Sequence, residues 1–260
     1  MNGPHMITLS KAKRLEVSGL GKSYGTLSIL SNLNLTVEPG AFICIVGPSG
    51  VGKTTLLRCL SGLAAPSEGS VSVGGAVITE PQAEIGLVFQ DYRGSLMPWM
   101  RTLENVAFPL EGRGVPKAER NRIALACLAD VGLENAAESY PWQLSGGMQQ
   151  RVAIARALAY DAHILLMDEP FGSLDAQTRL GLEDLVLALR KRLKISVIVV
   201  THDIDEAVYL ADRVVVLAGK PATVVDCVDI DLGYDRDQIR TKSDPRFVEY
   251  RNRVLGQIMA

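Results

Sequence analysis

The chain has 260 residues, a formal net charge of −2 and a hydrophobic fraction of 47%. Its length fits one large domain or two small ones, and its charge balance argues against a nucleic-acid partner. Its longest apolar runs are strand-length, so we expect neither a membrane span nor a secretory signal. Four widely spaced cysteines without a Cys-x-x-Cys pair argue against a zinc or redox site. We expect reduced, mostly buried thiols in a cytosolic protein.

Strands dominate the predicted N-terminal part of the chain. Residues 1–13 are expected to be disordered or left over from expression cloning. Residues 14–45 predict strands, because apolar side chains alternate with polar ones before a Glu-Pro-Gly turn. Further short strands are expected at 69–73, which a Gly-Gly turn follows, and at 85–89.

The middle of the chain, residues 102–159, is predicted to be helical. Thr102 is a candidate N-cap of the first helix, and Pro116 is expected in the first turn of a second helix. Ser145 is expected to cap a third helix, which starts at Gly146.

Strands and helices alternate in the predicted C-terminal half. The expected strands are 164–167, 195–200 and 214–217, and the expected helices are 175–193 and 204–210. This alternation predicts a mostly parallel sheet covered by helices, interrupted by a helical subdomain at about 91–159. Residues 226–260 form a more polar C-terminal extension that ends in a helix after Pro245. We expect a solvated surface with a docked final helix, with a regulatory or dimer-stabilising extension as the alternative.

The segment 47–54 has the pattern of glycine, four residues and Gly-Lys-Thr. It lies between a predicted strand and a predicted helix, which is the context of a phosphate-binding loop. Backbone N–H groups would surround a polyphosphate at the positive end of the helix. We expect Lys53 to reach the β- and γ-phosphates and Thr54 to hold Mg²⁺; a glycine-rich turn without a ligand is the alternative. The predicted nucleotide-binding residues here are Gly47, Pro48, Ser49, Gly50, Val51, Gly52, Lys53, Thr54 and Thr55.

Two carboxylates, Asp168 and Glu169, end a predicted buried strand. Because ligands of open α/β sheets lie at the carboxyl ends of the strands, Asp168 is expected beside the phosphate loop, where it can hold Mg²⁺. Glu169 is one residue further and can polarise the attacking water. A solvated acidic strand end is the alternative.

A second predicted anion-binding helix start is Ser145-Gly146-Gly147. One small site does not need two such cradles. We therefore expect two chains to face each other, each supplying one cradle to a shared nucleotide. A plain helix cap is the alternative.

These motifs together resemble the ATP-binding subunits of ABC transporters, over roughly residues 14–220. The resemblance implies an α/β fold of the ABC ATPase type over 14–225: a P-loop NTPase (RecA-like) core with an antiparallel β subdomain and an inserted helical subdomain. Ser145-Gly146-Gly147 resembles the family signature. Further matches are Tyr24 to the aromatic residue that stacks on adenine, Gln90 to the Q-loop glutamine, Asp175 to the D-loop and His202 to the switch histidine.

The resemblance also implies a division of roles within an ATP-sandwich dimer. Catalysis would involve Glu169, His202, Gln90 and Lys53, and Mg²⁺ would be held by Thr54, Gln90 and Asp168. Tyr24, the signature residues and Asp175 would complete the binding of ATP. One departure is Met148, which stands where the commonest signature has Gln and cannot donate an amide hydrogen bond. Met at this position is familiar among importers of the nitrate, sulfonate and taurine group.

The loop 93–100 is rich in large apolar residues, which are often partner contacts. The resemblance implies that it receives a helix of a membrane permease, with candidate contacts at Leu96, Met97, Pro98 and Trp99. Packing within the helical subdomain is the alternative.

The resemblance to this importer group rests on Leu-Met-Pro-Trp after the Q-loop, Glu-Asn-Val at 104–106, Leu-Ser-Gly-Gly-Met, and Arg-Phe at 246–247. It implies an ATP-hydrolysing subunit at the cytoplasmic face of the inner membrane. That subunit would energise import of a sulfonate, nitrate or taurine-like solute through a permease, with a periplasmic solute-binding protein. Alternatives are a soluble ABC ATPase of DNA repair or chromosome maintenance and the ATPase of a separate-subunit exporter.

Overall fold

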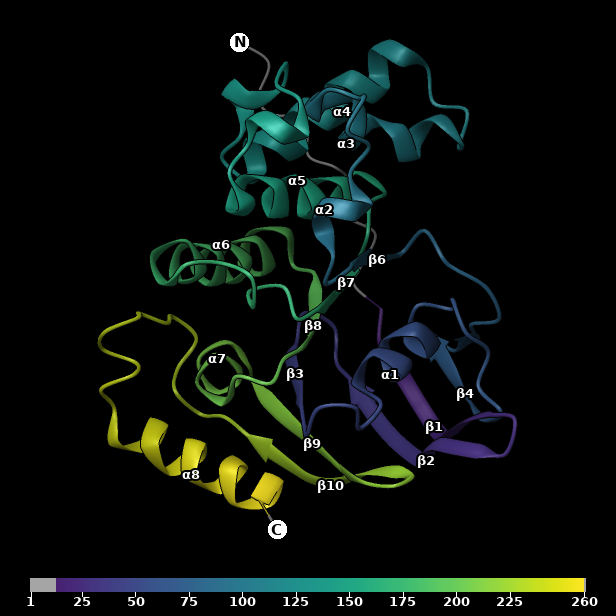
Figure 1. The fold of residues 1–260 in the computed structure, drawn as a ribbon, viewed down its shortest axis with the longest axis vertical. Coiled ribbons are helices and arrows are strands. Elements are labelled where there is room, and N and C mark those ends of the chain that lie inside the picture. Colours follow the sequence, from purple (N-terminus) through teal and green to yellow (C-terminus); the bar gives the residue numbers. More distant parts are fainter. Residues whose placement is uncertain (1–12, 260) are drawn as a thin grey trace.

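One mixed β-sheet organises the computed structural model, which describes residues 13–259 (Figure 1). The strands are β1 (Leu15–Tyr24), β2 (Leu27–Val37), β3 (Phe42–Val46), β4 (Glu68–Val73), β5 (Ala76–Val77), β6 (Ile85–Val88), β7 (Ile164–Asp168), β8 (Ser196–Val200), β9 (Arg213–Gly219) and β10 (Ala222–Asp229). Their order across the sheet is β5-β4-β1-β2-β10-β9-β3-β8-β7-β6. The N-terminal residues 1–12, for which disorder or a cloning origin is predicted, lie outside the described range.

Helices cover the sheet, and some of them form a separate layer at the top of Figure 1. They are α1 (Lys53–Leu60), α2 (Tyr92–Ser95), α3 (Thr102–Glu111), α4 (Lys117–Asp130), α5 (Gly146–Ala159), α6 (Ala176–Leu193), α7 (Ile204–Leu210) and α8 (Pro245–Met259), with the short 3₁₀ turns η1 (Glu134–Ala136) and η2 (Pro141–Gln143). The predicted helical subdomain corresponds to α2 through α5.

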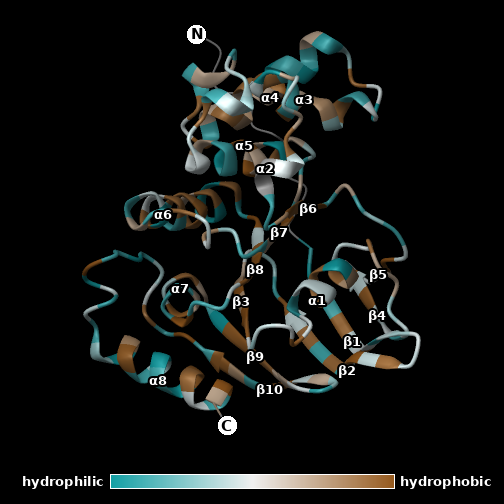
Figure 2. Cartoon of the chain, viewed as in Figure 1, coloured by the Kyte–Doolittle hydropathy of each residue, from teal (hydrophilic) through white to brown (hydrophobic). Residues whose placement is uncertain are grey.

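The strands β9, β3, β8, β7 and β6 run parallel and form one half of the sheet, with β6 at its edge. Side chains of β3 alternate between two cores: Phe42 and Cys44 pack into one, and Ile43 and Ile45 into the other. Because both faces are covered, these strands are almost entirely apolar (Figure 2). The predicted parallel α/β core is confirmed.

The antiparallel half contains β1, β2, β4 and β5, as the predicted β subdomain requires. It is continuous with the parallel half, because β10 pairs with β9 along its length and with β2 at the Ala222–Leu30 pair. The predicted boundary between residues 225 and 226 falls inside β10. The acidic residues that suggested a solvated extension include Asp229, which lies opposite Arg213 in the β9–β10 register and accepts from it at 2.6 Å.

Two predicted helix starts differ from the structure by one residue. Arg101, not Thr102, is the N-cap of α3, because the buried Thr102 is already helical and donates its hydroxyl to the Ser139 carbonyl oxygen at 2.8 Å. Pro116 is the N-cap of α4 rather than a first-turn residue. Ser145 caps α5 as predicted, accepting from the Met148 N–H at 3.3 Å.

The C-terminal helix α8 docks beside α7 and β9 through buried Phe247 and Val254. Among the described residues, no helix has both the length and the apolar character needed to cross a membrane. The cysteines are all free thiols, and all except Cys227 are buried.

Candidate nucleotide-binding site

The phosphate loop connects β3 to α1 at the carboxyl edge of the parallel strands. Two of its glycines are required by close packing. A Cβ atom on Gly47 would lie 2.4 Å from the Leu217 carbonyl oxygen, and one on Gly52 would lie 2.8 Å from Cδ2 of Leu30. Gly52 also has a φ of 115°, which favours glycine. The chain can therefore turn tightly into α1, whose first N–H groups have no intrahelical acceptor.

Lys53, the first residue of α1, folds back over this loop. Its Nζ donates to the carbonyl oxygens of Gly47 and Pro48 at 2.8 and 3.1 Å. Burial lowers the pKa of the Lys53 ammonium, whereas the carboxylates of Glu169 and Asp168 raise it. The cation thus lies between the loop carbonyls and the two predicted acidic residues.

The three residues predicted to hold Mg²⁺ line one pocket of about 200 Å³. Thr54 comes from α1, Gln90 follows β6 and Asp168 ends β7. Asp168 is 6% exposed, and its Oδ1 is buried without a hydrogen-bond partner. Burial raises the pKa of this carboxyl, and the Thr54 hydroxyl bond opposes the shift. An orphaned carboxylate oxygen beside a hydroxyl and an amide is a donor set that fits a hard divalent cation.

Sequence reasoning missed the other residues that line the same pocket: the aliphatic Leu57 and Leu87, and Arg58, Phe89 and Asp91. Arg58 could have been found, because it stands four residues after Thr54 and so shares its face of α1. Phe89 and Asp91 flank Gln90 and carry no separate sequence signal.

Glu169 and His202 meet beside this pocket. The Nδ1 of His202 lies 2.6 Å from Oε2 of Glu169. Glu169 has a φ of 47°, which is uncommon for a residue other than glycine, and its N–H donates to the Val200 carbonyl oxygen at 2.9 Å. That bond ties the ends of β7 and β8 together. The His202 side chain is 69% exposed, whereas that of Glu169 is 13% exposed.

The signature and the predicted D-loop residue both lie beside Thr178 of α6, and neither lines this pocket. No signature residue is among those lining the pocket in the described part of the chain. Gly147 is buried against α6, where an added Cβ would lie 2.2 Å from Cγ2 of Thr178. Asp175 caps α6, and its Oδ1 accepts from the Thr178 N–H at 3.0 Å. Ser145 remains exposed. Within one chain the second cradle therefore does not join the first.

Tyr24 ends β1 and is 49% exposed, with the Lys22 ammonium 5.0 Å from its ring centroid. Val51 belongs to the same predicted set, but its side chain is buried in the core beneath the loop. Only the main chain of Val51 can therefore face a phosphate.

The candidate permease contacts divide into buried and exposed residues. Leu96 is 3% exposed and packs into the core, so its prediction as a contact is wrong. Pro98 is exposed, and Trp99 is 73% exposed. Asn105 holds this loop, because its amide accepts from the Met97 N–H at 2.8 Å and donates to the Met97 carbonyl oxygen at 3.0 Å.

A groove of about 370 Å³ lies between Trp99 and the helices α3 and α4. Its lining combines apolar and charged side chains, including Phe108, Glu104 and Arg120. The exposed loop and this groove form one surface on the helical subdomain.

The sheet and the loop after β3 together define a P-loop nucleotide-binding protein. A sequence model of the family described as ABC transporter matches residues 30–172. The taurine import ATP-binding protein TauB of Pseudomonas entomophila is 45% identical over 95% of this chain and 96% of its own length. The nitrate import ATP-binding protein NrtD of Synechocystis sp. is 43% identical over 92% of this chain and 93% of its own.

The comparison with solved structures points to the same family. A dimeric post-hydrolysis state of the ATP-binding cassette MJ0796, bound to ADP and Pi, matches with a TM-score of 0.73 and 35% identity, covering 84% of this chain and 99% of that one. The chain belongs to the ABC transporter family, as one of its ATP-binding subunits, which are ATPases coupled to transport. The predicted family and fold class are confirmed.

Proposed function

We propose that this chain hydrolyses ATP at a site shared by two copies and thereby energises the import of a small solute through a membrane permease. The observation that carries the proposal is the 2.6 Å contact between His202 and Glu169, beside the pocket that contains Asp168. A carboxylate and an imidazole placed next to an anion-binding loop are suited to activate water against a terminal phosphate.

In this mechanism the phosphate loop binds and orients ATP, and Lys53 neutralises phosphate charge. Glu169 accepts a proton from the attacking water or orients it, and His202 holds the Glu169 carboxylate and contacts the γ-phosphate. Phosphoryl transfer needs mainly positioning and electrostatic stabilisation, which these groups supply. Thr54, Gln90 and Asp168 would hold Mg²⁺, which when bound supplies charge neutralisation at the phosphates.

The second half of each site comes from a second copy of the chain. Ser145 and Gly146, exposed or half-exposed at the start of α5, would contact the nucleotide held by the partner's phosphate loop. Asp175 and Tyr24 would complete the nucleotide contacts. The separation of the two cradles within one chain supports this arrangement, as does the dimeric state of the matched MJ0796 cassette. Closure is favoured by ATP because only the closed dimer completes these contacts.

The transported solute is a small sulfonate, nitrate or taurine-like molecule, as the similarity to the taurine importer subunit TauB and the nitrate importer subunit NrtD suggests. The chain works at the cytoplasmic face of the membrane, bound to its permease, with a periplasmic solute-binding protein as a further component. The surface that fits the permease is the loop around Trp99 and the adjoining groove.

The test is capture of the tagged chain from detergent-solubilised membranes of its native host, followed by mass spectrometry. Recovery of a multi-span permease with wild type and its loss with Trp99→Ala would support the proposal. The matched control is Trp142→Ala, because Trp142 is 70% exposed on a different turn. Recovery with DNA or ribosome components and no permease would contradict it.

A further inference from the structure

The loop that carries His202 is held by hydrogen bonds on both sides of the imidazole. Thr201 donates its N–H to the Ile45 carbonyl oxygen at 3.2 Å and its hydroxyl to Oε2 of Glu206 at 2.7 Å. The same hydroxyl accepts from the Asp203 N–H at 3.0 Å. The His202 ring is largely exposed, so its position depends on these anchors of its backbone and on the 2.6 Å contact with Glu169.

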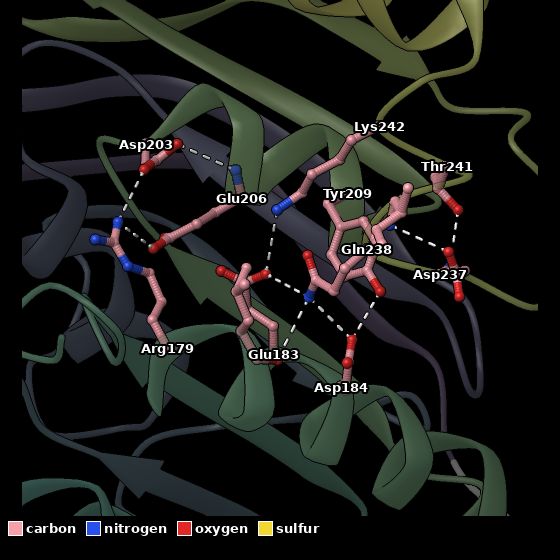
Figure 3. Close-up of polar contacts among 12 residues, drawn as sticks. Arg179, Glu183, Asp184, Asp203, Glu206, Tyr209, Asp237, Gln238, Thr241 and Lys242 are labelled. Atoms are coloured by element: carbon pink, nitrogen blue, oxygen red, sulfur yellow. Dashed lines mark hydrogen bonds and ion pairs between the residues drawn. The ribbon is translucent and has the colours of Figure 1, made fainter. Parts of the chain in front are cut away.

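Two acidic side chains, Asp203 in this loop and Glu206 on α7, face one cation on α6 (Figure 3). Arg179 Nη1 on α6 lies 3.4 Å from Oδ2 of Asp203 and 3.9 Å from Oε1 of Glu206. Asp203 also caps α7 by accepting from the Glu206 N–H at 3.1 Å. Glu206 is 4% exposed, so its carboxylate has little access to solvent. The guanidinium therefore offsets the repulsion between two carboxylates that are held together.

Arg179 stands on the first turn of α6, which touches two other motifs of the site. Its N–H donates to the Asp175 carbonyl oxygen at 2.9 Å. The preceding residue, Thr178, caps onto Asp175 and lies directly over Gly147 of the signature helix. One helical turn thus contacts the predicted D-loop, the signature and, through Arg179, the loop of His202.

We propose that Arg179 is a positioning residue for ATP hydrolysis, which couples the first turn of α6 to the loop that holds His202. The proposal rests on the role of His202 given under the proposed function. Arg179 does not touch the nucleotide in this account. It acts by keeping Asp203 and Glu206, and hence the imidazole between Thr201 and Asp203, in the hydrolytic geometry.

The experiment compares steady-state ATPase kinetics of Arg179→Met and Arg179→Lys with the wild type. Arg179→Met is expected to lower kcat about 10- to 100-fold, because a small misplacement of a catalytic group has effects of this size, with KM for ATP changed less than about twofold. Arg179→Lys retains a cation and should recover kcat to within about fivefold of wild type. The matched control is Arg253→Met on α8, which removes a bidentate pair with Asp226 of β10 and should leave kcat unchanged.

Several outcomes would overturn the proposal. If Arg179 only stabilises the fold, Arg179→Met should lower the melting temperature but leave kcat of the folded protein at the wild-type value. That result would contradict the positioning role. His202→Ala is measured alongside: if it retains wild-type kcat, the proposed role of His202 fails and the positioning role falls with it. If His202→Ala is inactive while Arg179→Met is fully active, only the positioning role fails.

A second variant covers the case in which Arg179→Met does not fold. Asp203→Asn removes one of the two carboxylates while an asparagine still caps α7. It is expected to lower kcat about 3- to 10-fold with KM for ATP unchanged, since half of the contact with Arg179 is lost. Wild-type kcat in Asp203→Asn would contradict the positioning role.

Discussion

The Nδ1 atom of His202 lies 2.6 Å from Oε2 of Glu169, although 33 residues separate them in the chain. The contact exists because β7 and β8 are adjacent parallel strands, with Asp168 opposite Val200 at their carboxyl ends. Glu169 directly follows the last residue of β7, and His202 is the second residue after β8. The sheet register therefore builds the hydrolytic pair.

Removing the imidazole tests this pair. His202→Ala is expected to lower kcat for ATP about 100- to 1,000-fold, because the Glu169 carboxylate loses the partner that orients it. KM for ATP should change little, since the phosphate loop binds the nucleotide. Phosphate release under steady-state conditions measures both values. Unchanged turnover would remove His202 from the mechanism.

Gly52→Ala should weaken ATP binding. The new methyl group would meet Cδ2 of Leu30 at 2.8 Å and Cγ2 of Ile29 at 2.9 Å, at a backbone φ of 115°. These side chains or the loop must shift, and alanine is strained at this φ, so we expect an increase of at least about tenfold in the Kd of a fluorescent ATP analogue. Gly256→Ala is the control: it lies in α8 in open space and should leave the Kd unchanged. Equal Kd values for Gly52→Ala and wild type would contradict the packing argument.

Glu206 gives the stability of the protein a dependence on pH. Burial, with the nearby carboxylates of Asp203 and Glu183, raises its pKa from 4.5 to about 7, whereas the Thr201 hydroxyl bond and Arg179 lower it. Because the folded protein binds this proton more tightly than the unfolded chain, wild type loses stability as pH rises between these two values. The loss is about 3 kcal/mol.

Glu206→Gln removes that titration and keeps an acceptor oxygen for Thr201. The unfolding free energy of the variant minus that of wild type should therefore rise by about 3 kcal/mol between pH 4 and pH 8. Urea unfolding at several pH values measures the difference. A difference that does not change with pH would contradict the buried, titrating carboxylate.

The segment between β10 and α8 should contribute to stability through Lys242. Its Nζ lies 3.6 Å from Oε2 of Glu183, a side chain that is 1% exposed and whose pKa burial raises (Figure 3). At pH 8, Lys242→Met is expected to lower the unfolding free energy by about 1–3 kcal/mol, because Glu183 keeps only the hydrogen bond from Gln238. The loss should shrink at lower pH, where Glu183 takes up a proton.

The control for this prediction is Lys191→Met. Lys191 pairs with Asp235 at 2.6 Å, but both side chains are mostly exposed, so its loss should lower the unfolding free energy much less than the loss of Lys242 does. Equal effects of the two substitutions would mean that the Glu183 contact is not a buried ion pair.

The phosphate loop and the buried strands could be predicted from short stretches of sequence alone. A glycine-rich turn between an apolar strand and a helix is defined within one short segment, as 41–63 shows. The two carboxylates at the end of β7, Asp168 and Glu169, were predictable for the same reason, since a buried parallel strand ends at the edge of the sheet where ligands bind. These elements carry Thr54 and Asp168 to the pocket, and Lys53 to the carbonyl oxygens of the phosphate loop.

Features that depend on distant contacts could not be predicted from the sequence. The acidic residue Asp229 gives no sign that it belongs to a strand until its cross-strand partner Arg213 is known, although its side chain stays 74% exposed, as a solvated surface predicts. Leu96 looks like an exposed loop residue, yet the helical subdomain buries it. The positioning role proposed for Arg179 depends on its contact with Asp203, which lies 24 residues away on another element. In each case a tertiary partner decides the environment.

The most direct test of the account is the mass of Glu169→Gln in solution, measured by light scattering after size exclusion, with and without ATP and Mg²⁺. Because this variant binds ATP but lacks the base, the closed dimer should persist. We predict the 28.1 kDa chain alone without nucleotide and twice that mass with ATP, while phosphate release stays at background. A variant that remains monomeric with ATP bound, or that hydrolyses ATP as fast as wild type, would contradict the shared site.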